Sequence, residues 1–364
     1  LFSFGLGVFV ALSCALAIGC NHEPAPISKQ KLEVARQDEA LTRGGELYGR
    51  MCKVCHGADG EGYKADNAPA LSNQQFLAAV DDKSMFASIF EGRPNTVMSA
   101  WASSRGGPLS NGDIDALVKF IRAWQKVPSA KLDERPLRGD AARGQPIYDR
   151  ECVKCHGARG LGGPNIRIGD PAWLARSSDG FLRYTIAHGR APTPMPAFTQ
   201  LDAQSIDDLI TLLRGFANGP GAPPPLPPPP SMPPPIPLGP VPLNPKGPEP
   251  VGFVVHPGTT SATLVHDQLA KGARMALLDA RASSDYTGEH IAGAVSVPFY
   301  DPAPYFDKLP KDAWLVCYCA CPHAESGELA QKLVTAGFKK VTVLDEGLGT
   351  WKAKGWKTST GPKP

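Results

Sequence analysis

A five-residue motif built on two cysteines and a histidine occurs twice in the chain, and its repetition limits the fold more than any other feature. The motif reads C-K-V-C-H at residues 52–56 and C-V-K-C-H at residues 152–156. The similarity extends on both sides, because an Arg-Gly pair precedes each copy and a Gly-Arg pair followed by a methionine comes after it. Such self-similarity predicts two copies of one folding unit. We place them at residues 41–127 and 139–218 and call them the first and the second repeat.

The spacing C-x-x-C-H is the signature of covalent haem attachment. Two thiols three positions apart on a helical turn reach the two vinyl groups of one porphyrin, and the adjacent histidine then projects toward the iron. We therefore expect two covalently bound haem c groups, with iron. The expected thioether cysteines and proximal ligands are Cys52, Cys55 and His56 in the first repeat and Cys152, Cys155 and His156 in the second. A zinc or redox site would explain one such motif, but two in register within a repeat disfavour it.

The sixth iron ligand should come from the other side of each haem. Met98 and Met195 occupy the same position in the two repeats, and methionine is scarce, with six in the chain. We predict both as axial ligands, and a packing role is the alternative. His188 is interpreted as an ordinary histidine, because its counterpart in the first repeat is Glu91.

Helical periodicity supports this interpretation. Apolar residues between 111 and 124 fall on one face of a helix, which Ser110 or Asn111 could cap, and the same pattern recurs in the second repeat. Arg93 and Arg190 also recur, either as partners of haem propionates or as surface arginines. Both repeats resemble class I cytochromes c along their whole length. The resemblance implies two all-α domains, each with a low-spin His/Met haem of moderately high potential.

The first 19 residues carry no charge and are mostly apolar, and Cys20 follows directly. This resembles a bacterial lipoprotein signal peptide, in which the cysteine is lipidated and becomes the mature N-terminus. A plain transmembrane anchor is the alternative, because nineteen apolar residues nearly span a bilayer. We expect a signal peptide at 1–19, a tether at 20–40, and a lipid anchor at Cys20 on the periplasmic side of a bacterial membrane.

Seventeen of the 38 prolines lie between Gly219 and Pro250. Such a tract favours extended polyproline II and offers few backbone donors for helix or sheet. At about 3.1 Å per residue it would reach roughly 100 Å when fully extended. We predict a spacer at 219–250; a docking motif for a proline-binding module is the alternative.

The pattern after Val251 changes to alternating strands and helices. Strands are predicted at 275–281, 295–298, 314–318 and 341–344, with a helix at 326–336. Alternation of this kind predicts an α/β domain with a parallel sheet.

This domain, at residues 251–360, resembles the rhodanese family. The resemblance rests on L-D-A-R at 278–281, H-I-A-G-A at 290–294, the loop that begins at Cys319, and D-E-G at 345–347 followed by Trp351. It implies that Cys319 is the nucleophile that carries sulfur as a persulfide. A loop between a strand end and a helix N-terminus offers backbone N–H groups that lower the pKa of a thiol.

The loop departs from the family pattern in three places. Ala324 stands where many active members have an arginine, so we expect poor use of thiosulfate and consider polysulfide or a protein persulfide as donors. Glu325 is expected to add negative charge and repel anionic donors. Cys321 is a candidate second thiol, and a Cys319–Cys321 redox pair is an alternative to persulfide chemistry.

The remaining local cysteine, Cys317, is predicted to be a small buried residue in the middle of a strand. A metal site made from the three cysteines at 317, 319 and 321 with His323 is a weaker alternative.

The net charge of +3, from 38 basic and 35 acidic residues, disfavours nucleic acid as a partner. Three functional hypotheses remain: an electron carrier coupled to sulfur chemistry, a plain carrier with an inactive rhodanese-like binding or sensing module, and a respiratory-chain component that feeds an oxidase. The expected partners are redox proteins of a respiratory chain, the membrane and a sulfur compound.

Overall fold

The structure is a computed structural model. It describes residues 29–62, 65, 67–93, 96–162, 165–218, 241, 244–320 and 323–364, with side chains from residue 37 onward. The predicted signal peptide, the predicted lipidation site Cys20, nearly all of the proline-rich spacer and Cys321 lie outside these residues. Within the described part of the chain, no helix has both the length and the hydropathy needed to cross a bilayer.

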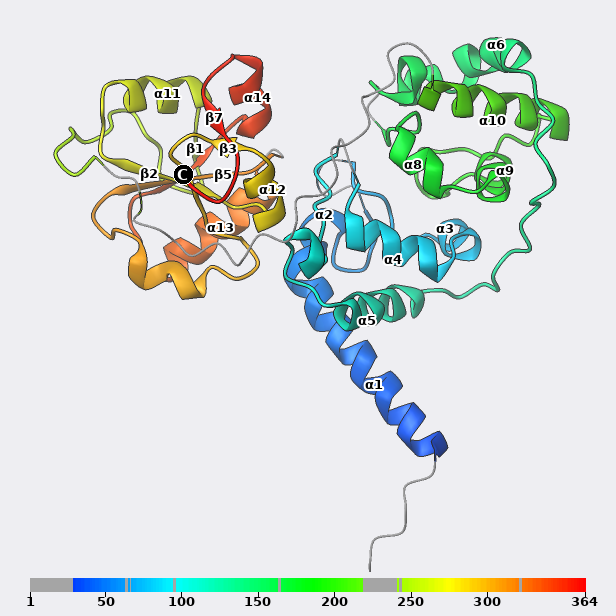
Figure 1. Cartoon of the computed structure of the whole chain (residues 1–364), viewed down its shortest axis with the longest axis horizontal. Helices are drawn as coiled ribbons and strands as arrows, with labels where there is room; N and C mark the ends of the chain where they lie inside the picture. Colours follow the sequence, from blue (N-terminus) through cyan, green and yellow to red (C-terminus); the bar gives the residue numbers. More distant parts are fainter. Residues whose placement is uncertain are drawn as a thin grey trace, which may run out of the picture. The chain divides into compact units, whose positions relative to one another are not determined.

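The regular elements described in the first repeat are helices, joined by loops (Figure 1). Its elements are α1 (Lys29–Leu47), the π-helix η1 (Tyr48–Cys52), α2 (Lys53–His56), α3 (Gln74–Ala79), α4 (Asp82–Glu91), the 3-10 helix η2 (Ser103–Arg105) and α5 (Asn111–Arg122). The predicted boundary between the tether and the first repeat, at residues 40 and 41, falls inside α1, because this helix begins well before the motif.

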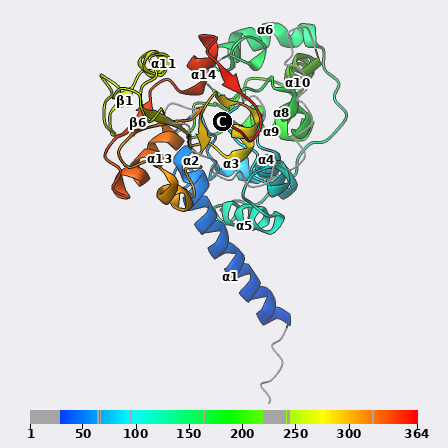
Figure 2. The same cartoon turned by 60° about the vertical axis from the view of Figure 1, so that its left-hand side comes forward.

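The helices of the second repeat follow a similar order, except that the 3-10 helix comes directly after the motif helix and not before the last helix. They are α6 (Ala141–Glu151), α7 (Val153–His156), the 3-10 helix η3 (Ala158–Gly160), α8 (Pro171–Arg176), α9 (Asp179–His188) and α10 (Ala203–Asn218). Helices α6 and α10 lie side by side (Figure 2). Gly144 permits this close crossing, because a Cβ at this position would lie 2.4 Å from the Asp208 carbonyl oxygen, and Gly44 meets Ala116 in the same way in the first repeat.

The last helix of each repeat confirms the predicted periodicity. Ser110 caps α5: its hydroxyl accepts from the N–H of Asp113, and the Asp113 carboxylate accepts from the N–H of Ser110. The residues that face the core are Ile114, Leu117, Val118 and Ile121 in α5, and Ile206, Leu209, Ile210, Leu213 and Phe216 in α10.

The C-terminal domain has a five-stranded parallel sheet in the order β1-β6-β5-β2-β4, as the alternating pattern predicts. Its strands are β1 (Thr259–Thr260), β2 (Met275–Asp279), β4 (Val295–Ser296), β5 (Trp314–Tyr318) and β6 (Val341–Leu344), and β3 (His290–Ile291) pairs antiparallel with β7 (Thr358–Ser359). Strand β4 ends earlier than predicted. Pro298 has no N–H with which to extend the ladder.

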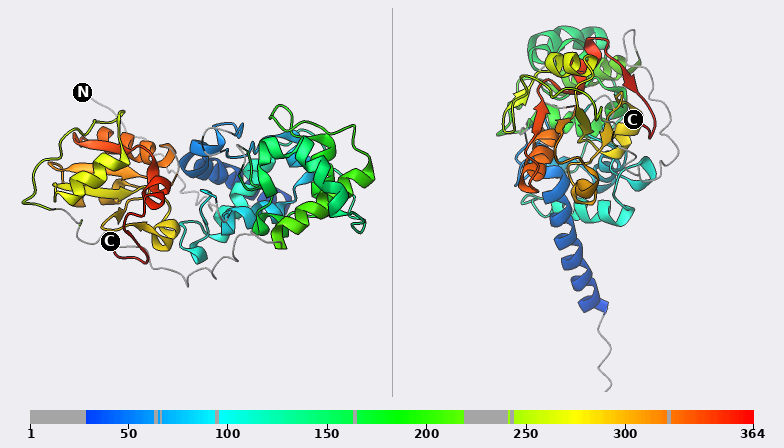
Figure 3. Two further views of the ribbon diagram at one scale, coloured as in Figure 1. Left: turned by 90° about the horizontal axis from the view of Figure 1, so that it is seen from above. Right: turned by 90° about the vertical axis from the view of Figure 1, so that its left-hand side faces the viewer.

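Helices cover both faces of this sheet. They are α11 (Ala262–Ala270), α12 (Ser283–Gly288), the 3-10 helix η4 (Ala303–Lys308), α13 (Ala324–Thr335) and α14 (Gly347–Ala353). Alternate strand residues pack against α13 on one side and against α11 and α14 on the other (Figures 1 and 3). Helix α13 begins at Ala324, two residues before the predicted start at residue 326. The loop that follows β5 is correspondingly short.

Candidate haem and cysteine sites

The first motif holds its histidine in a fixed orientation. His56 ends α2 and is buried, and its Nδ1 lies 2.9 Å from the Pro69 carbonyl oxygen. Nδ1 therefore carries the hydrogen and donates, which leaves Nε2 available as a metal ligand. Burial lowers the pKa of His56, which favours the neutral imidazole that metals bind. The Tyr48 hydroxyl donates to the Gly57 carbonyl oxygen at 2.7 Å and secures the turn after the motif.

The second motif repeats this arrangement. His156 Nδ1 lies 2.9 Å from the Ile166 carbonyl oxygen, and the Tyr148 hydroxyl donates to the Gly157 carbonyl oxygen at 2.8 Å. Sequence reasoning did not identify Pro69 and Ile166, because a backbone carbonyl leaves no mark on residue identity.

The two methionines occupy matching loops. The N–H of Arg93 donates to the Met98 carbonyl oxygen at 2.9 Å, and the N–H of Arg190 donates to the Met195 carbonyl oxygen at 2.9 Å. A threonine hydroxyl accepts from the N–H of each methionine, Thr96 at 3.2 Å and its counterpart in the second repeat at 3.4 Å. Each loop therefore presents its methionine in the same local conformation.

All eight predicted haem residues line one continuous cavity of 830 Å³. They are Cys52, Cys55, His56, Met98, Cys152, Cys155, His156 and Met195. Each half offers two thiols, an imidazole with a fixed tautomer, a thioether sulfur and a largely apolar lining, and this donor set fits a haem c. Arg93 and Arg190 also line the cavity and are placed to meet propionates, whereas His188 stacks on Tyr184 and is absent from the lining.

The rhodanese-like domain places Cys319 directly after β5. The side chain is almost fully buried, and its Sγ lies 3.2 Å from the Ser326 hydroxyl oxygen in the first turn of α13. The Arg281 guanidinium pairs with the Asp279 carboxylate and donates to the Glu289 carbonyl oxygen. The ion pair of Asp279 with Arg281 therefore stabilises the fold at the end of β2.

The burial of Glu325 disfavours the negative charge that we expect beside Cys319 from the sequence. Glu325 is 6% exposed. Burial, followed by the charge of Cys319, raises the pKa of its carboxyl well above the usual range, which favours the neutral form. The sequence placed Glu325 in the loop before the predicted helix and could not show that its side chain is buried.

Two other residues near Cys319 can be placed. Cys317 is fully buried in β5, as predicted, and burial raises its pKa. His323 pairs with Asp345, with Nε2 and Oδ1 3.0 Å apart. No group of three or more His, Cys, Asp or Glu side chains that could hold a metal ion occurs among the described residues, which do not include Cys321.

Glu325→Gln is expected to leave the rate of Cys319 alkylation near pH 7 unchanged, because a protonated carboxyl and an amide are both neutral and similar in shape. The rate can be followed by peptide mass spectrometry, which separates Cys319 from its neighbours. A marked acceleration in the variant would mean that Glu325 is ionised in the folded protein, contrary to this prediction.

The loop that carries Met98 also contacts the rhodanese-like domain. The Ser99 hydroxyl donates to the Asp285 carboxylate at 2.5 Å, and the Ser284 hydroxyl donates to the Ala100 carbonyl oxygen at 3.1 Å. Glu325 lines the same cavity as Met98. Sequence reasoning did not identify these contacts, because they join residues nearly two hundred positions apart.

Comparisons with known proteins agree with this geometry. The family model described as "Cytochrome C oxidase, cbb3-type, subunit III" matches residues 39–121 and again 139–213, and the "Rhodanese-like domain" model matches residues 261–354.

Several curated proteins are similar to the helical half of the chain. The cbb3-type cytochrome c oxidase subunit FixP of Bradyrhizobium diazoefficiens is 29% identical over 191 residues, which cover 50% of this chain and 62% of that protein. The cytochrome bc1 complex cytochrome c subunit of Mycobacterium leprae is 28% identical over 44% of this chain and 55% of its own length. The chain thus spans less than two thirds of these relatives.

A solved rhodanese-like domain from Anabaena is 31% identical to this chain; the match covers 28% of this chain and 78% of that one, with a TM-score of 0.27.

The motifs, the cavity and the two family matches lead to one conclusion. The chain is a c-type cytochrome with two cytochrome c domains, which carry covalently attached haem c, followed by a rhodanese-like domain.

Proposed function

We propose that this protein is an electron carrier outside the cytoplasm, held at a membrane by a lipid on Cys20 and exchanging electrons with proteins of a respiratory chain. The observation that carries the proposal is the single cavity lined by both C-x-x-C-H motifs and both loop methionines. The relatives named above are a subunit of an oxidase and a subunit of a bc1 complex, which supports a respiratory partner.

Within this proposal each side chain has a defined task. Bound haem c supplies one-electron redox chemistry. The four motif cysteines would hold it covalently, and His56, His156, Met98 and Met195 would ligate the iron. The Pro69 and Ile166 carbonyls keep the two imidazoles oriented. The apolar lining excludes water, which limits the reorganisation that accompanies electron transfer.

We further propose that Cys319 feeds electrons into this carrier. Forming an S–S bond between the Cys319 thiol and the sulfur of hydrogen sulfide or another thiol breaks two S–H bonds and releases two protons and two electrons, one electron for each haem. The Ser326 hydroxyl, 3.2 Å from Sγ, can hydrogen-bond the sulfur. The contacts of Ser99 and Ala100 with the rhodanese-like domain support a short route to the first repeat.

The test is the rate at which the oxidised, haem-loaded protein is reduced by sulfide, followed by absorption. Cys319→Ser is expected to lose most of this rate, because the variant cannot form the S–S bond. Cys317→Ala is the matched control: it removes a thiol two residues away and should reduce at the parent rate. Equal rates in the parent and in Cys319→Ser would eliminate the sulfur coupling while leaving the electron carrier intact.

A plain respiratory carrier with an inactive rhodanese-like binding or sensing module is the second candidate. Ala324 favours it, because the position offers no side-chain cation for an anionic sulfur donor. It predicts that thiosulfate and sulfide both fail to reduce the haems through Cys319, whereas a respiratory donor reduces them normally.

A further inference from the structure

The two repeats contact each other through equivalent residues. The Arg93 guanidinium lies over the Trp173 ring at 5.9 Å, and the Arg190 guanidinium lies over the Phe76 ring at 5.8 Å. The arginines occupy matching positions in the two repeats, and so do the two aromatic residues. Each arginine therefore reaches across to the other repeat, as in an interface with two-fold symmetry.

One pair of equivalent positions breaks this symmetry. Asn73 and Asp170 are both buried, and both cap the helix that carries the aromatic residue. Asn73 Oδ1 accepts from the Phe76 N–H at 2.9 Å, and Asp170 Oδ1 accepts from the Trp173 N–H at 3.0 Å. The first repeat therefore places a neutral amide where the second repeat places a carboxylate.

The two side chains meet the opposite repeat differently. The Asn73 amide donates to the carbonyl oxygens of Arg190 at 3.1 Å and of Ala191 at 2.8 Å. Asp170 instead interacts electrostatically with the Arg93 side chain: burial lowers the pKa of Arg93 to about 10, and the Asp170 carboxylate opposes this. Arg93 belongs to the loop that carries Met98, because its N–H donates to the Met98 carbonyl oxygen at 2.9 Å. This arginine therefore lies at the site of the first repeat, which contains His56.

We propose that Asp170 makes the two haem sites unequal, lowering the reduction potential of the site that contains His56 below that of the site that contains His156. A buried negative charge favours the oxidised, more positive form of a nearby redox centre, and burial leaves little solvent to screen it. Electrons then move downhill from the first repeat to the second. The inference rests on haem binding in both repeats and is independent of the sulfur chemistry at Cys319.

The test exchanges the two residues one at a time. Asp170→Asn and Asn73→Asp are nearly isosteric, and each keeps a side-chain oxygen that can cap its helix. A spectroscopic redox titration of the holoprotein, fitted with two one-electron centres, is expected to show two potentials in the parent. Asp170→Asn should raise the lower one, changing the equilibrium constant for electron exchange between the haems about tenfold, which corresponds to about 59 mV.

Asn73→Asp is the reciprocal variant, because it places a carboxylate beside Arg190. It should lower the higher potential and leave the lower one in place. The NMR signals of the methyl groups of the two ligating methionines assign each potential to its repeat. Potentials that do not move in either variant, or that move together by equal amounts, would overturn the inference alone. A parent protein with one haem would overturn the proposed function and this inference with it.

Discussion

A chain in which both Cys152 and Cys155 are replaced by alanine is expected to carry one covalently bound haem instead of two. Thioether bonds are the only covalent link between a haem c and the protein, and each repeat supplies its own pair of thiols. The His156 imidazole and the Met195 loop remain, but coordination alone does not survive denaturation. The mass of the denatured protein, together with the haem that acidified acetone extracts, measures the change.

The matching variant in the first repeat, Cys52→Ala with Cys55→Ala, should lose the other haem and give the same mass. Cys317→Ala is the control, because this thiol is buried in β5 of the rhodanese-like domain and does not line the cavity that both motifs share. It should retain both haems. Two covalent haems in either double variant would show that attachment does not follow the motifs.

The two motifs could be read from the sequence because covalent attachment demands fixed residues at fixed spacing. The same holds for the Ser110 cap of α5 and for the buried stripes of α5 and α10, which depend on local pattern alone. The parallel sheet follows from the order of strands and helices. Each of these features depends on residues that are close together in the sequence or on the order of elements along it, and not on contacts between distant segments.

Features that depend on distant segments could not be read in this way. The charge of Glu325 depends on its burial, and burial depends on packing that no local pattern records. The difference between Asn73 and Asp170 is visible once the repeats are aligned, yet its meaning requires Arg93 and Arg190 to be found at the contact. Local signals thus predicted the elements and the ligand types, whereas charge states emerged only from the fold.

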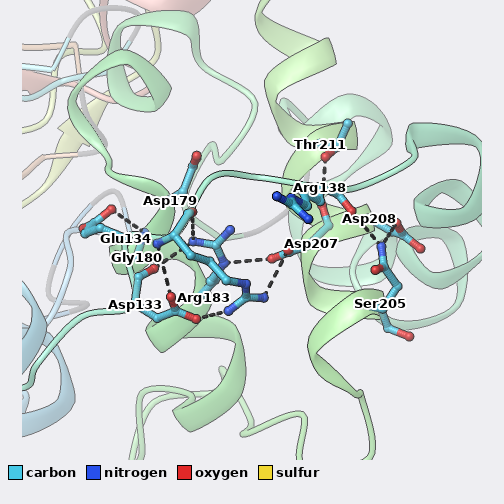
Figure 4. A network of polar contacts seen from close by, with 12 residues as sticks. Asp133, Glu134, Arg138, Asp179, Gly180, Arg183, Ser205, Asp207, Asp208 and Thr211 are labelled. Atoms are coloured by element: carbon cyan, nitrogen blue, oxygen red, sulfur yellow. Dashed lines mark hydrogen bonds and ion pairs between the residues drawn. The ribbon is translucent and has the colours of Figure 1, made fainter.

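The segment that joins the two repeats is held by a polar network (Figure 4). Arg183, in α9, donates through Nη1 to the carbonyl oxygens of Asp133 at 2.7 Å and of Arg135 at 3.0 Å. Its Nε donates to Asp207 Oδ1 at 2.7 Å, and Arg135 Nη2 donates to Asp207 Oδ2 at 3.1 Å. The carboxylate of Glu134 accepts from the Gly180 N–H at 3.0 Å. Asp207 is therefore the shared acceptor for two arginines.

Asp207→Ala is expected to destabilise the second repeat by about 3–5 kcal/mol, the range typical of a buried ion pair that loses one partner. The side chains of Arg183 and Asp207 are only 7% and 4% exposed, so the variant leaves a buried guanidinium without its carboxylate. Chemical denaturation of the holoprotein, followed by circular dichroism, measures the loss as a lower midpoint.

Asp133→Ala is the matched control for Asp207→Ala, because it removes the same charge from the same network where water can compensate. Asp133 is 49% exposed and pairs with Arg135, which is 42% exposed. Such a pair contributes about 0–1 kcal/mol to stability.

The stability that Asp207 contributes also depends on pH. Burial alone would raise the pKa of Asp207, but Arg183 and Arg135 lower it overall, so its contribution is present above the usual carboxyl pKa and is lost as pH falls through the lowered value. The difference in stability between the parent and Asp207→Ala should therefore disappear in acid. Equal losses of stability in Asp207→Ala and Asp133→Ala at pH 7 would contradict the role of burial.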